Sequence, residues 1–278
     1  MLDLDMMTTR LKPGLGKVNQ RWVSALPDQL AALVGEWELD LGAGFDSGAT
    51  SVVLGCAGPL GDAVLKLAPD PYALAEEVAA LRQFAPSGRV PRVLATARGA
   101  VLLEAIRPGT LVELLPQAPT PVEYAQFLGE LHAAGDPASA PRALGDWLEL
   151  LYATGERNGA DVARSRRITT GLLADPVDPV LLHGDLHLGN VLASDARGMV
   201  AKNPTACAGD PCFDAADFVL EGWDRAAMVW RRDELARAAG LDVDRLDAWC
   251  RALAPLGAAR SPIPDRVTEL LAFGRGEY

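Results

Sequence analysis

The sequence predicts an α+β fold of two lobes, in which a small β-rich lobe with mostly antiparallel strands precedes a larger helical lobe. Two observations lead to this prediction. Short apolar runs separated by glycine-rich turns fill much of the first 105 residues, whereas longer segments with helical apolar spacing dominate the rest. Because the chain has 278 residues, one or two domains are expected. We therefore place a boundary near residue 105, between segments 1–105 and 106–278.

Composition excludes several classes of protein. The chain has 37 acidic and 26 basic residues, so its net charge is −11 and its surface as a whole repels phosphate backbones. The longest basic cluster, residues 164–167, is too short for a nucleic-acid site, and no apolar run reaches the roughly 18 residues of a membrane span. The acidic start, with Asp3 and Asp5, is unlike a secretory signal. Because the four cysteines lack C-x-x-C spacing, we expect a cytoplasmic protein without a disulfide framework. We also expect a monomer or a homodimer.

The first lobe is predicted to begin with a short helix from Pro27 to about Trp37, because proline suits the first helical position. Residues 39–48 look like a loop. The runs 50–54 and 63–67 predict two strands of an antiparallel hairpin with a longer turn.

A helix over 72–84 follows from apolar residues that recur with a period of 3.6. Two more strands are expected over 92–97 and 100–105.

The second lobe begins after Pro108-Gly109 and is mainly helical. Thr120 and Glu123 form a capping box around Pro121, which predicts a helix that runs to about Ala134. A β-rich insert is expected over about 180–205. Further helices are expected near 144–157, 160–174, 214–239, 243–254 and 263–272.

The segment 181–192 carries the strongest chemical signal. An apolar strand leads into a polar loop, which leads into another apolar strand. Asp185 and Asn190 lie on this loop in the pattern H-x-D-x-x-x-x-N, the catalytic-loop spacing of phosphoryl-transfer enzymes. In that chemistry the aspartate accepts the proton of the attacking hydroxyl and the asparagine oxygen binds Mg²⁺. Taken alone, the motif leaves open a metal hydrolase with His183, Asp185 and His187 as ligands.

Signals in the first lobe favour phosphoryl transfer. Lys66 lies on a predicted strand, where a cation could hold nucleotide phosphates, and Glu77 lies eleven residues later on the next helix, where it can pair with that lysine. Gly42, Gly44 and Gly48 could form a loop over the phosphates, although they lack the full G-x-G-x-x-G spacing.

Taken together, these motifs make the chain resemble the aminoglycoside phosphotransferase superfamily, most closely its streptomycin 6-kinase and hydroxyurea-kinase branch. The resemblance implies a two-lobed, protein-kinase-like fold and ATP-dependent phosphorylation of a small hydroxylated compound, with Mg²⁺ as a further cofactor and antibiotic resistance as the role. The motifs that carry it are residues 49–53, 64–66, 77–81, 103–110, 131–132, 182–192 and 209–214.

The resemblance also assigns roles to residues of both lobes. It makes 1–105 the nucleotide-binding lobe and 106–278 the lobe of the catalytic loop and the acceptor. Lys66 would bind phosphate and Glu77 would orient it, and Asp185 would be the catalytic base. Leu103 would be the gatekeeper-like position, and the backbone of Glu104, Ala105 and Ile106 would meet the adenine. Asn190 would bind Mg²⁺, His183 would support the loop and Asp210 would brace it.

One position departs from the pattern of such kinases. A second metal-binding aspartate is expected about eighteen residues after the base, within an apolar-Asp-Pro context. The chain has Asn203 there, preceded by Lys202. An amide can offer Mg²⁺ one oxygen, but it lacks the negative charge that this cation prefers. The chain could be an inactivated variant, a nucleotide-binding pseudokinase or an enzyme with a rearranged metal site.

The acceptor is predicted to bind to the helical lobe. Asp214, Asp217, Glu221 and Asp224 are spaced by three, four and three residues, which predicts one acidic helix face. Such a face could be solvated and favour the helix dipole. It could instead recognise the ammonium or guanidinium groups of a cationic acceptor, an aminoglycoside such as streptomycin.

Overall fold

The computed structural model describes residues 16–45 and 50–278 and divides into two compact units. The first unit ends at Arg82 and also takes in Pro91–Arg107, and the second comprises Gln83–Val90 and Pro108–Tyr278. Within the described residues, no helix combines the length and the apolar character that crossing a membrane requires.

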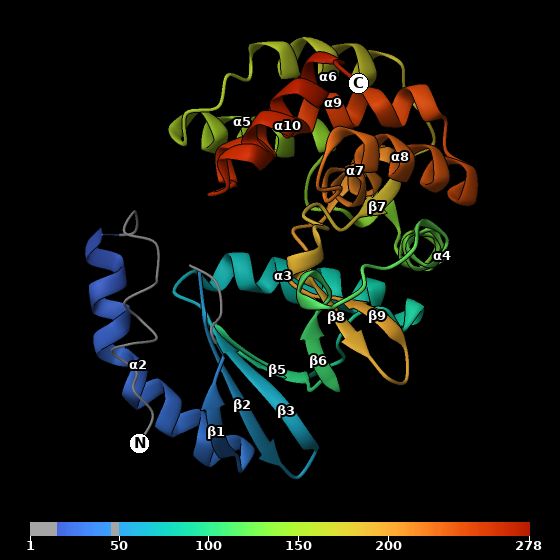
Figure 1. The fold of residues 1–278 in the computed structure, drawn as a ribbon. Coiled ribbons are helices and arrows are strands. Elements are labelled where there is room, and N and C mark those ends of the chain that lie inside the picture. The colour runs from blue at the N-terminus through green and yellow to red at the C-terminus, as the bar shows by residue number, and fades with distance from the viewer. Residues whose placement is uncertain (1–15, 46–49) are drawn as a thin grey trace. The chain divides into compact units, whose positions relative to one another are not determined.

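The first unit is built on a five-stranded antiparallel sheet with the order β1-β2-β3-β5-β4 (Figure 1). The antiparallel pairing predicted for this half is confirmed. The loop expected over 39–48 is wrong at its start, since Asp40–Gly44 forms edge strand β1, and Gly48 lies outside the described residues. The strands are β1 (Asp40–Gly44), β2 (Val52–Gly58), β3 (Gly61–Leu67), β4 (Val93–Ala97) and β5 (Ala100–Glu104).

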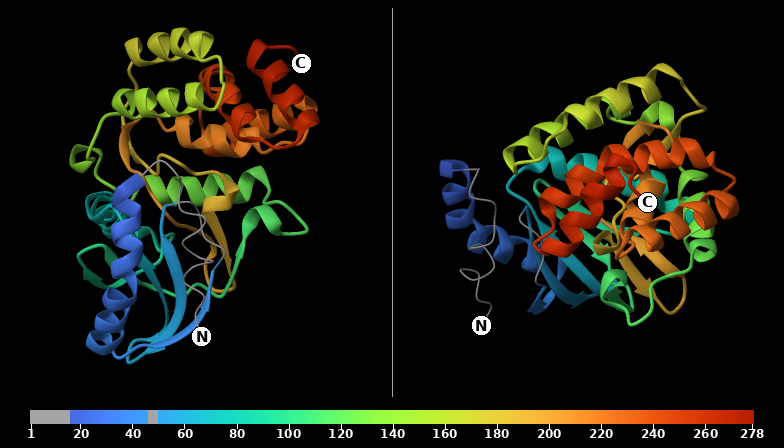
Figure 2. Two further views of the ribbon diagram at one scale, coloured as in Figure 1. Left: turned by 90° about the vertical axis from the view of Figure 1, so that its left-hand side faces the viewer. Right: turned by 45° about the horizontal axis from the view of Figure 1, so that its top comes forward.

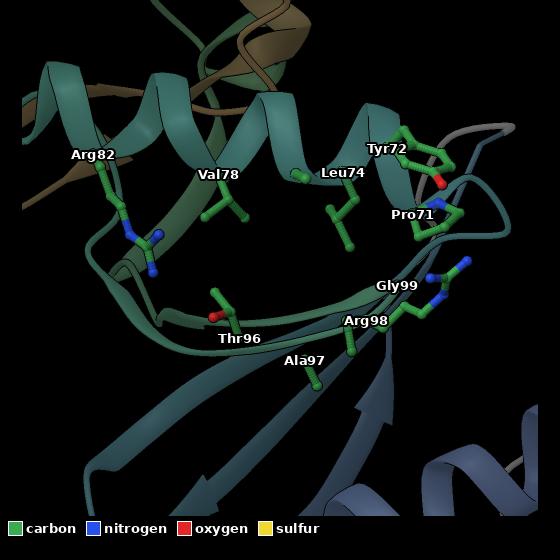
Figure 3. A pocket seen from close by; sticks show the side chains of 11 residues that line it. Pro71, Tyr72, Leu74, Val78, Arg82, Thr96, Ala97, Arg98 and Gly99 are labelled. Carbon is green, nitrogen blue, oxygen red and sulfur yellow. The ribbon is translucent and has the colours of Figure 1, made fainter.

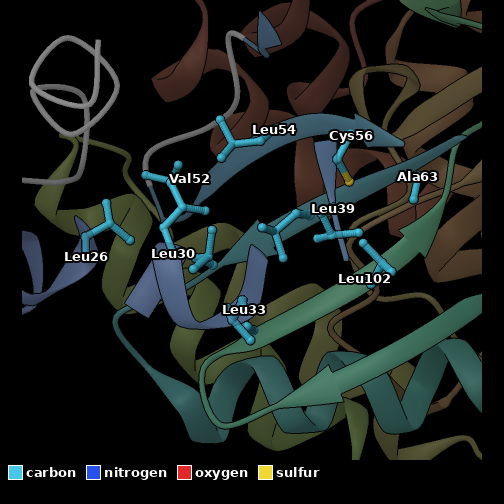
Figure 4. Close-up of a cluster of buried hydrophobic side chains, with 12 residues drawn as sticks. Leu26, Leu30, Leu33, Leu39, Val52, Leu54, Cys56, Ala63 and Leu102 are labelled. Carbon is cyan, nitrogen blue, oxygen red and sulfur yellow. The ribbon is translucent and has the colours of Figure 1, made fainter. Parts of the chain in front are cut away.

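Among the described residues of this unit, two helices accompany the sheet, α2 (Gly16–Trp37) and α3 (Pro71–Phe84). The helix start predicted at Pro27 is wrong, because this proline lies inside α2. A proline inside a helix costs roughly 3 kcal/mol. Burial offsets that cost, since apolar side chains of α2 pack with the sheet in one core cluster (Figure 4). Its members include Leu26, Leu30 and Leu33 of the helix and Val52, Leu54, Leu65 and Leu67 of the sheet.

A groove in the first unit is lined by one side of α3 and by the β4–β5 hairpin (Figure 3). Its lining includes Leu74 and Val78 from the helix and Thr96 and Ala97 from the hairpin. Lys66 is not part of this lining, so the groove is separate from the lysine that the sequence assigns to phosphate.

The second unit is mainly helical, as predicted. Helix α9 is central, because α5, α6, α7, α8 and α10 all contact it (Figures 1 and 2). The helices are α4 (Pro121–His132), α5 (Leu144–Arg157), α6 (Ala163–Ala174), α7 (Cys212–Leu220), α8 (Arg225–Ala239), α9 (Val243–Arg260) and α10 (Pro264–Arg275), with short 3₁₀ turns at Ala85–Ser87, Val112–Leu114, Pro137–Ser139 and Leu188–Asn190.

The predicted capping box of α4 is present. The Thr120 backbone N–H donates to Glu123 Oε2 at 2.8 Å, and the Glu123 N–H donates to Thr120 Oγ1 at 3.2 Å. Two small sheets complete this unit, with the orders β6-β8-β9 and β10-β7. Strand β6 was not expected, because Pro108 and Gly109 read as a turn. The strands are β6 (Pro108–Leu111), β7 (Val180–Leu182), β8 (Val191–Ser194), β9 (Gly198–Ala201) and β10 (Cys207–Gly209).

Candidate active site

In the first unit, Lys66 and Glu77 form the expected ion pair. Side chains alternate along β3, so Leu65 and Leu67 enter the core with α2 while Lys66 points to the opposite face. Lys66 is buried, and its Nζ lies 2.6 Å from both carboxylate oxygens of Glu77 on α3. A buried ammonium is stable only when it is paired. The pair therefore fixes both the lysine head and the position of α3 on the sheet.

The predicted hinge begins at Glu104, the last residue of β5. Leu103 is buried on β5 opposite Val64 of β3, and Ile106 is also buried. The backbone N–H of Glu104 donates to the Arg92 carbonyl at 2.9 Å, and the Glu104 side chain accepts from the Arg92 N–H at 3.1 Å. The Ala105 N–H donates to the Asp62 carbonyl at 3.4 Å. The backbone of this segment is thus fixed within the first unit, whereas its contact with adenine stays a prediction.

In the second unit, the strand–loop–strand pattern around Asp185 is confirmed, with β7 before the loop and β8 after it. The Asn190 Nδ2 donates to both the backbone carbonyl and the Oδ2 of Asp185, each at 2.9 Å. The Asp185 side chain is 34% exposed, so an acceptor can reach it. The spacing of five residues therefore allows the asparagine to orient the aspartate.

His183 supports this loop from inside. It is fully buried, its Nε2 donates to the Lys202 carbonyl at 3.0 Å, and its Nδ1 accepts from the Asp185 N–H at 3.4 Å. Burial lowers the pKa of His183 below its usual value, although the nearby carboxylates of Asp214 and Asp185 act in the opposite direction. The imidazole is therefore neutral, and both of its nitrogens form hydrogen bonds with backbone groups.

Asp214, at the start of α7, braces the same loop. Its carboxylate is fully buried and accepts from the backbone N–H groups of His183 at 2.7 Å and Gly184 at 3.0 Å. It also lies 2.9 Å from His132 Nε2. Burial alone would raise the pKa of Asp214, but the hydrogen bonds from His132 and from the Gly184 backbone, together with the adjacent imidazoles, outweigh it and hold the pKa below its usual value. This carboxylate is a structural anion and is not available to an acceptor.

Two predictions about the acidic residues are corrected here. Asp210 does not brace the loop, since its carboxylate accepts from the Cys212 N–H at 2.9 Å, Arg245 Nε at 2.5 Å and Trp249 Nε1 at 2.6 Å. It therefore ties α7 to α9.

The single acidic helix face is also wrong. Asp214 is buried, and α7 ends at Leu220. Asp224 instead caps α8 by accepting from the Ala227 N–H at 2.8 Å. Only Asp217 and Glu221 remain as partly exposed acids of this set.

Three titratable side chains, those of Arg260, His187 and Asp217, lie near the carboxylate of Asp185. Arg260 Nη1 lies 3.8 Å from its Oδ1, and His187 Nε2 lies 3.7 Å from its Oδ2. Burial raises the pKa of Asp217 to about 8, and the negative charge of Asp185 adds to this effect while Arg260 opposes it. Asp217 therefore carries its proton at neutral pH. Neither the closeness of Arg260 nor this protonation could be read from the sequence.

The position that departs from the kinase pattern lies directly beside Asn190. Asn203 has a left-handed backbone with φ of 60°, which asparagine tolerates better than most residues. Its Nδ2 donates to Asn190 Oδ1 at 3.1 Å, and Lys202 Nζ lies 3.3 Å from the same oxygen. An amide oxygen has two lone pairs, so both acceptor sites of this expected metal ligand are used.

The donor set does not fit a magnesium ion held by the chain. Mg²⁺ prefers carboxylate and water oxygens in octahedral geometry, whereas Asn190 faces an ammonium and an amide N–H. In the described ranges 16–45 and 50–278, no three His, Cys, Asp or Glu side chains are grouped so that they could bind a metal. Both nitrogens of His183 bond to backbone atoms, which does not favour the metal-hydrolase alternative with His183, Asp185 and His187 as ligands.

A lysine on an antiparallel sheet paired with a glutamate on the following helix, and an Asp–Asn loop in a helical unit, are features of kinase-like phosphotransferases. The comparisons agree with this class. Residues 37–262 match the model of a family described as aminoglycoside/hydroxyurea antibiotic resistance kinase. The chain therefore belongs to this family of kinases.

Two relatives show how similar the chain is to named enzymes. It is 33% identical over 267 residues to a hydroxyurea phosphotransferase of Kitasatospora aureofaciens, covering 88% of this chain and 75% of the relative. It is 30% identical over 256 residues to a streptomycin 6-kinase of Streptomyces glaucescens, covering 84% and 82%.

Similarity to solved structures confirms the two-lobed, kinase-like fold. A thermostable mutant of aminoglycoside phosphotransferase APH(4)-Ia, in ternary complex with ADP and hygromycin B, matches with a TM-score of 0.62 and 18% sequence identity. The match covers 89% of this chain and 96% of that one.

Proposed function

We propose that this kinase transfers the γ-phosphoryl group of ATP to a hydroxyl oxygen of a small compound, with Asp185 as the catalytic base. One observation carries the proposal. The Asp185 carboxylate is one-third exposed, yet Asn190 Nδ2 donates to its Oδ2 and to the backbone carbonyl of the same residue, each at 2.9 Å. A base that is both accessible and oriented suits proton transfer from an acceptor. Because the relatives are named kinases, the family gives no support to the pseudokinase alternative.

On the nucleotide side, we assign phosphate binding to Lys66, held in place by Glu77. Their 2.6 Å ion pair supports this assignment, as does the ADP complex of the structural relative. The backbone of Glu104, Ala105 and Ile106 is assigned to the adenine, with Leu103 beneath it. Segment 1–105 then forms the nucleotide-binding lobe and 106–278 the acceptor lobe, and the reaction takes place in the cytoplasm, where ATP is available.

The chemistry assigned to the chain is simple. The acceptor hydroxyl gives its proton to Asp185 as its oxygen bonds to the γ-phosphorus, and the bond from that phosphorus to the bridging oxygen breaks, which leaves ADP. The bonds of Asn190, His183 and Asp214 hold the loop in place during this step. Mg²⁺ is proposed here only as the counter-ion of ATP phosphates in solution, because Asn190 and Asn203, the ligands expected from the sequence, bond to each other.

The first proposed acceptor is a cationic aminoglycoside such as streptomycin. The relative from Streptomyces glaucescens is named for its action on streptomycin. Asp217 and Glu221, close in sequence to the loop-bracing Asp214, are the acids left to recognise its guanidinium groups. Because Asp217 has a pKa of about 8, a bound cation would displace its proton. Acceptor binding would then release protons near neutral pH.

Hydroxyurea is a second proposed acceptor, and the structure offers a specific reason for it. Arg260 lies 3.8 Å from Asp185, and Asp217 is protonated at neutral pH, so the surroundings of the base are less acidic than the sequence suggests. A small neutral acceptor meets no repulsion from Arg260, whereas a cationic one does. The hydroxyurea phosphotransferase relative is consistent with this alternative.

The test is product mass spectrometry with ATP and a panel that contains streptomycin, hydroxyurea and an aminoglycoside without guanidinium groups. A single added phosphoryl group on one acceptor is expected, together with ADP. Asp185→Asn should lower the rate at least 100-fold, within the range of general-base effects. The exposed Asp195, on the turn after β8, offers Asp195→Asn as a matched control. If every panel member stays unmodified while nucleotide binds, the proposed acceptor class is wrong.

A further inference from the structure

The amide oxygen of Asn190 is the centre of an unusual arrangement in the second unit. The atoms around it keep the spacing of a metal site although their chemistry differs. Asn203 Nδ2 lies 3.1 Å from this oxygen. Neighbouring ligands of an octahedral Mg²⁺ with bonds of about 2.0–2.1 Å are about 3 Å apart. The position of Asn203 is thus suitable for a second ligand atom, but the atom that faces Asn190 is a donor.

The orientation of the Asn203 amide follows from its surroundings. Turning it over would place two amide oxygens about 3 Å apart, and neither can donate a hydrogen bond. Lys202 Nζ adds a positive charge 3.3 Å from the same Asn190 oxygen, which favours an oxygen over an N–H group there. The side chains of Asn190, Lys202 and Asn203 therefore satisfy one another's hydrogen bonds without a bound cation.

The backbone of Lys202 is fixed on both sides. Its N–H donates to the Asn190 carbonyl at 2.8 Å, and its carbonyl accepts from His183 Nε2 at 3.0 Å. Both partners belong to the catalytic loop that carries Asp185. The ammonium is therefore tied to the same loop as the proposed base.

The charges also balance. A carboxylate with a bound divalent cation carries a net charge of +1. Lys202 together with the neutral Asn203 carries the same net charge, without an ion. The two differences from the apolar-Asp pattern therefore compensate each other electrostatically, whereas either one alone would not.

We propose that the Lys202 ammonium takes the place of a divalent cation and receives the phosphate charge of the nucleotide, so that this chain binds ATP without a divalent metal. The inference rests on the proposed nucleotide site. Lysine serves as a point charge for phosphate in other proteins, so the chemistry is within its range. The Asn190 side chain then accepts a hydrogen bond that positions the ammonium, and it does not act as a metal ligand.

Isothermal titration calorimetry of the full chain tests this proposal with ATP as the probe, once in EDTA and once in MgCl₂. The Kd in EDTA is expected to lie within about threefold of the Kd in MgCl₂. Lys202→Met should weaken binding in EDTA at least tenfold, which is about 1.4 kcal/mol. Arg167→Met is the matched control, because it removes one exposed positive charge from α6 and should leave both constants unchanged.

A double variant, Lys202→Met with Asn203→Asp, should recover the metal dependence, with ATP binding at least tenfold tighter in MgCl₂ than in EDTA. The two Kd values of the unaltered chain, in EDTA and in MgCl₂, need no variant. They therefore test the metal-free binding of ATP even if a variant folds poorly. Tenfold tighter binding by the unaltered chain in MgCl₂ would overturn the inference alone. So would equal binding in EDTA by the Lys202→Met variant. No binding in either buffer would overturn the proposed nucleotide site as well.

Discussion

Replacing Asp214 by alanine should destabilise the chain strongly, because the catalytic loop depends on this buried carboxylate. It accepts two backbone N–H bonds, at 2.7 and 3.0 Å, and pairs with His132 at 2.9 Å. Hydrogen bonds to a charged group are worth about 1.5–3 kcal/mol each, and each buried N–H left without a partner costs about 1–3 kcal/mol. These terms overlap, so we expect a loss of about 4 kcal/mol in the free energy of unfolding.

Urea unfolding followed by circular dichroism measures this loss. Asp214→Asn keeps the shape and one acceptor oxygen, so a smaller loss of about 2 kcal/mol is expected. Asp195→Ala, at an exposed turn position, should change stability by less than about 0.5 kcal/mol. An Asp214→Ala variant within 1 kcal/mol of the unaltered chain would refute the bracing role.

Three further predictions concern charge at the candidate active site. Asn203→Asp alone should weaken ATP binding in EDTA roughly threefold in calorimetry, because the added carboxylate would offset the positive charge of the Lys202 ammonium; unchanged affinity would contradict this reading of the position. Lys66→Met should weaken ATP binding roughly 10- to 100-fold in calorimetry, through the loss of one charged hydrogen bond; Lys66→Met with Glu77→Gln controls for the carboxylate left unpaired, and unchanged affinity in both variants would remove Lys66 from the site. Asp217→Asn should change the pH dependence of stability. The pKa of Asp217 is raised from 3.8 to about 8, so the folded chain holds a proton that the unfolded chain has lost, and stability falls as pH rises through this window. In thermal melts the advantage of Asp217→Asn should grow from pH 5 to pH 8 and then level off, and an advantage independent of pH would be inconsistent with the raised pKa.

Local signals in the sequence predicted much of the fold. The capping box at Thr120 joins residues three apart in the sequence, and the pair of Lys66 and Glu77 joins residues eleven apart. Both are present. The β1 strand was missed because its glycines, at positions 42 and 44, provide no alternation of side chains. The helix start predicted at Pro27 was wrong for another reason. Burial of apolar side chains of α2 in the core outweighs the local cost of a proline inside the helix.

At the candidate site, spacing along the chain identified Asp185, Asn190 and the unusual Asn203. It could not distinguish a buried aspartate from an exposed one, so Asp214 was placed on an acidic helix face that either is solvated or recognises a cationic acceptor. Its partners, His132 and His183, lie 82 and 31 residues away, and only folding brings them together. The position of Arg260 beside the base likewise depends on the packing of α9, for which no short motif exists.

The central claim is that this chain phosphorylates a small hydroxylated acceptor with Asp185 as the base. Mass spectrometry of the acceptor after incubation with ATP tests it most directly. The account predicts one added phosphoryl group with the unaltered chain and with Asp195→Asn, and at least 100-fold slower formation with Asp185→Asn. Equal product formation by Asp185→Asn would contradict it.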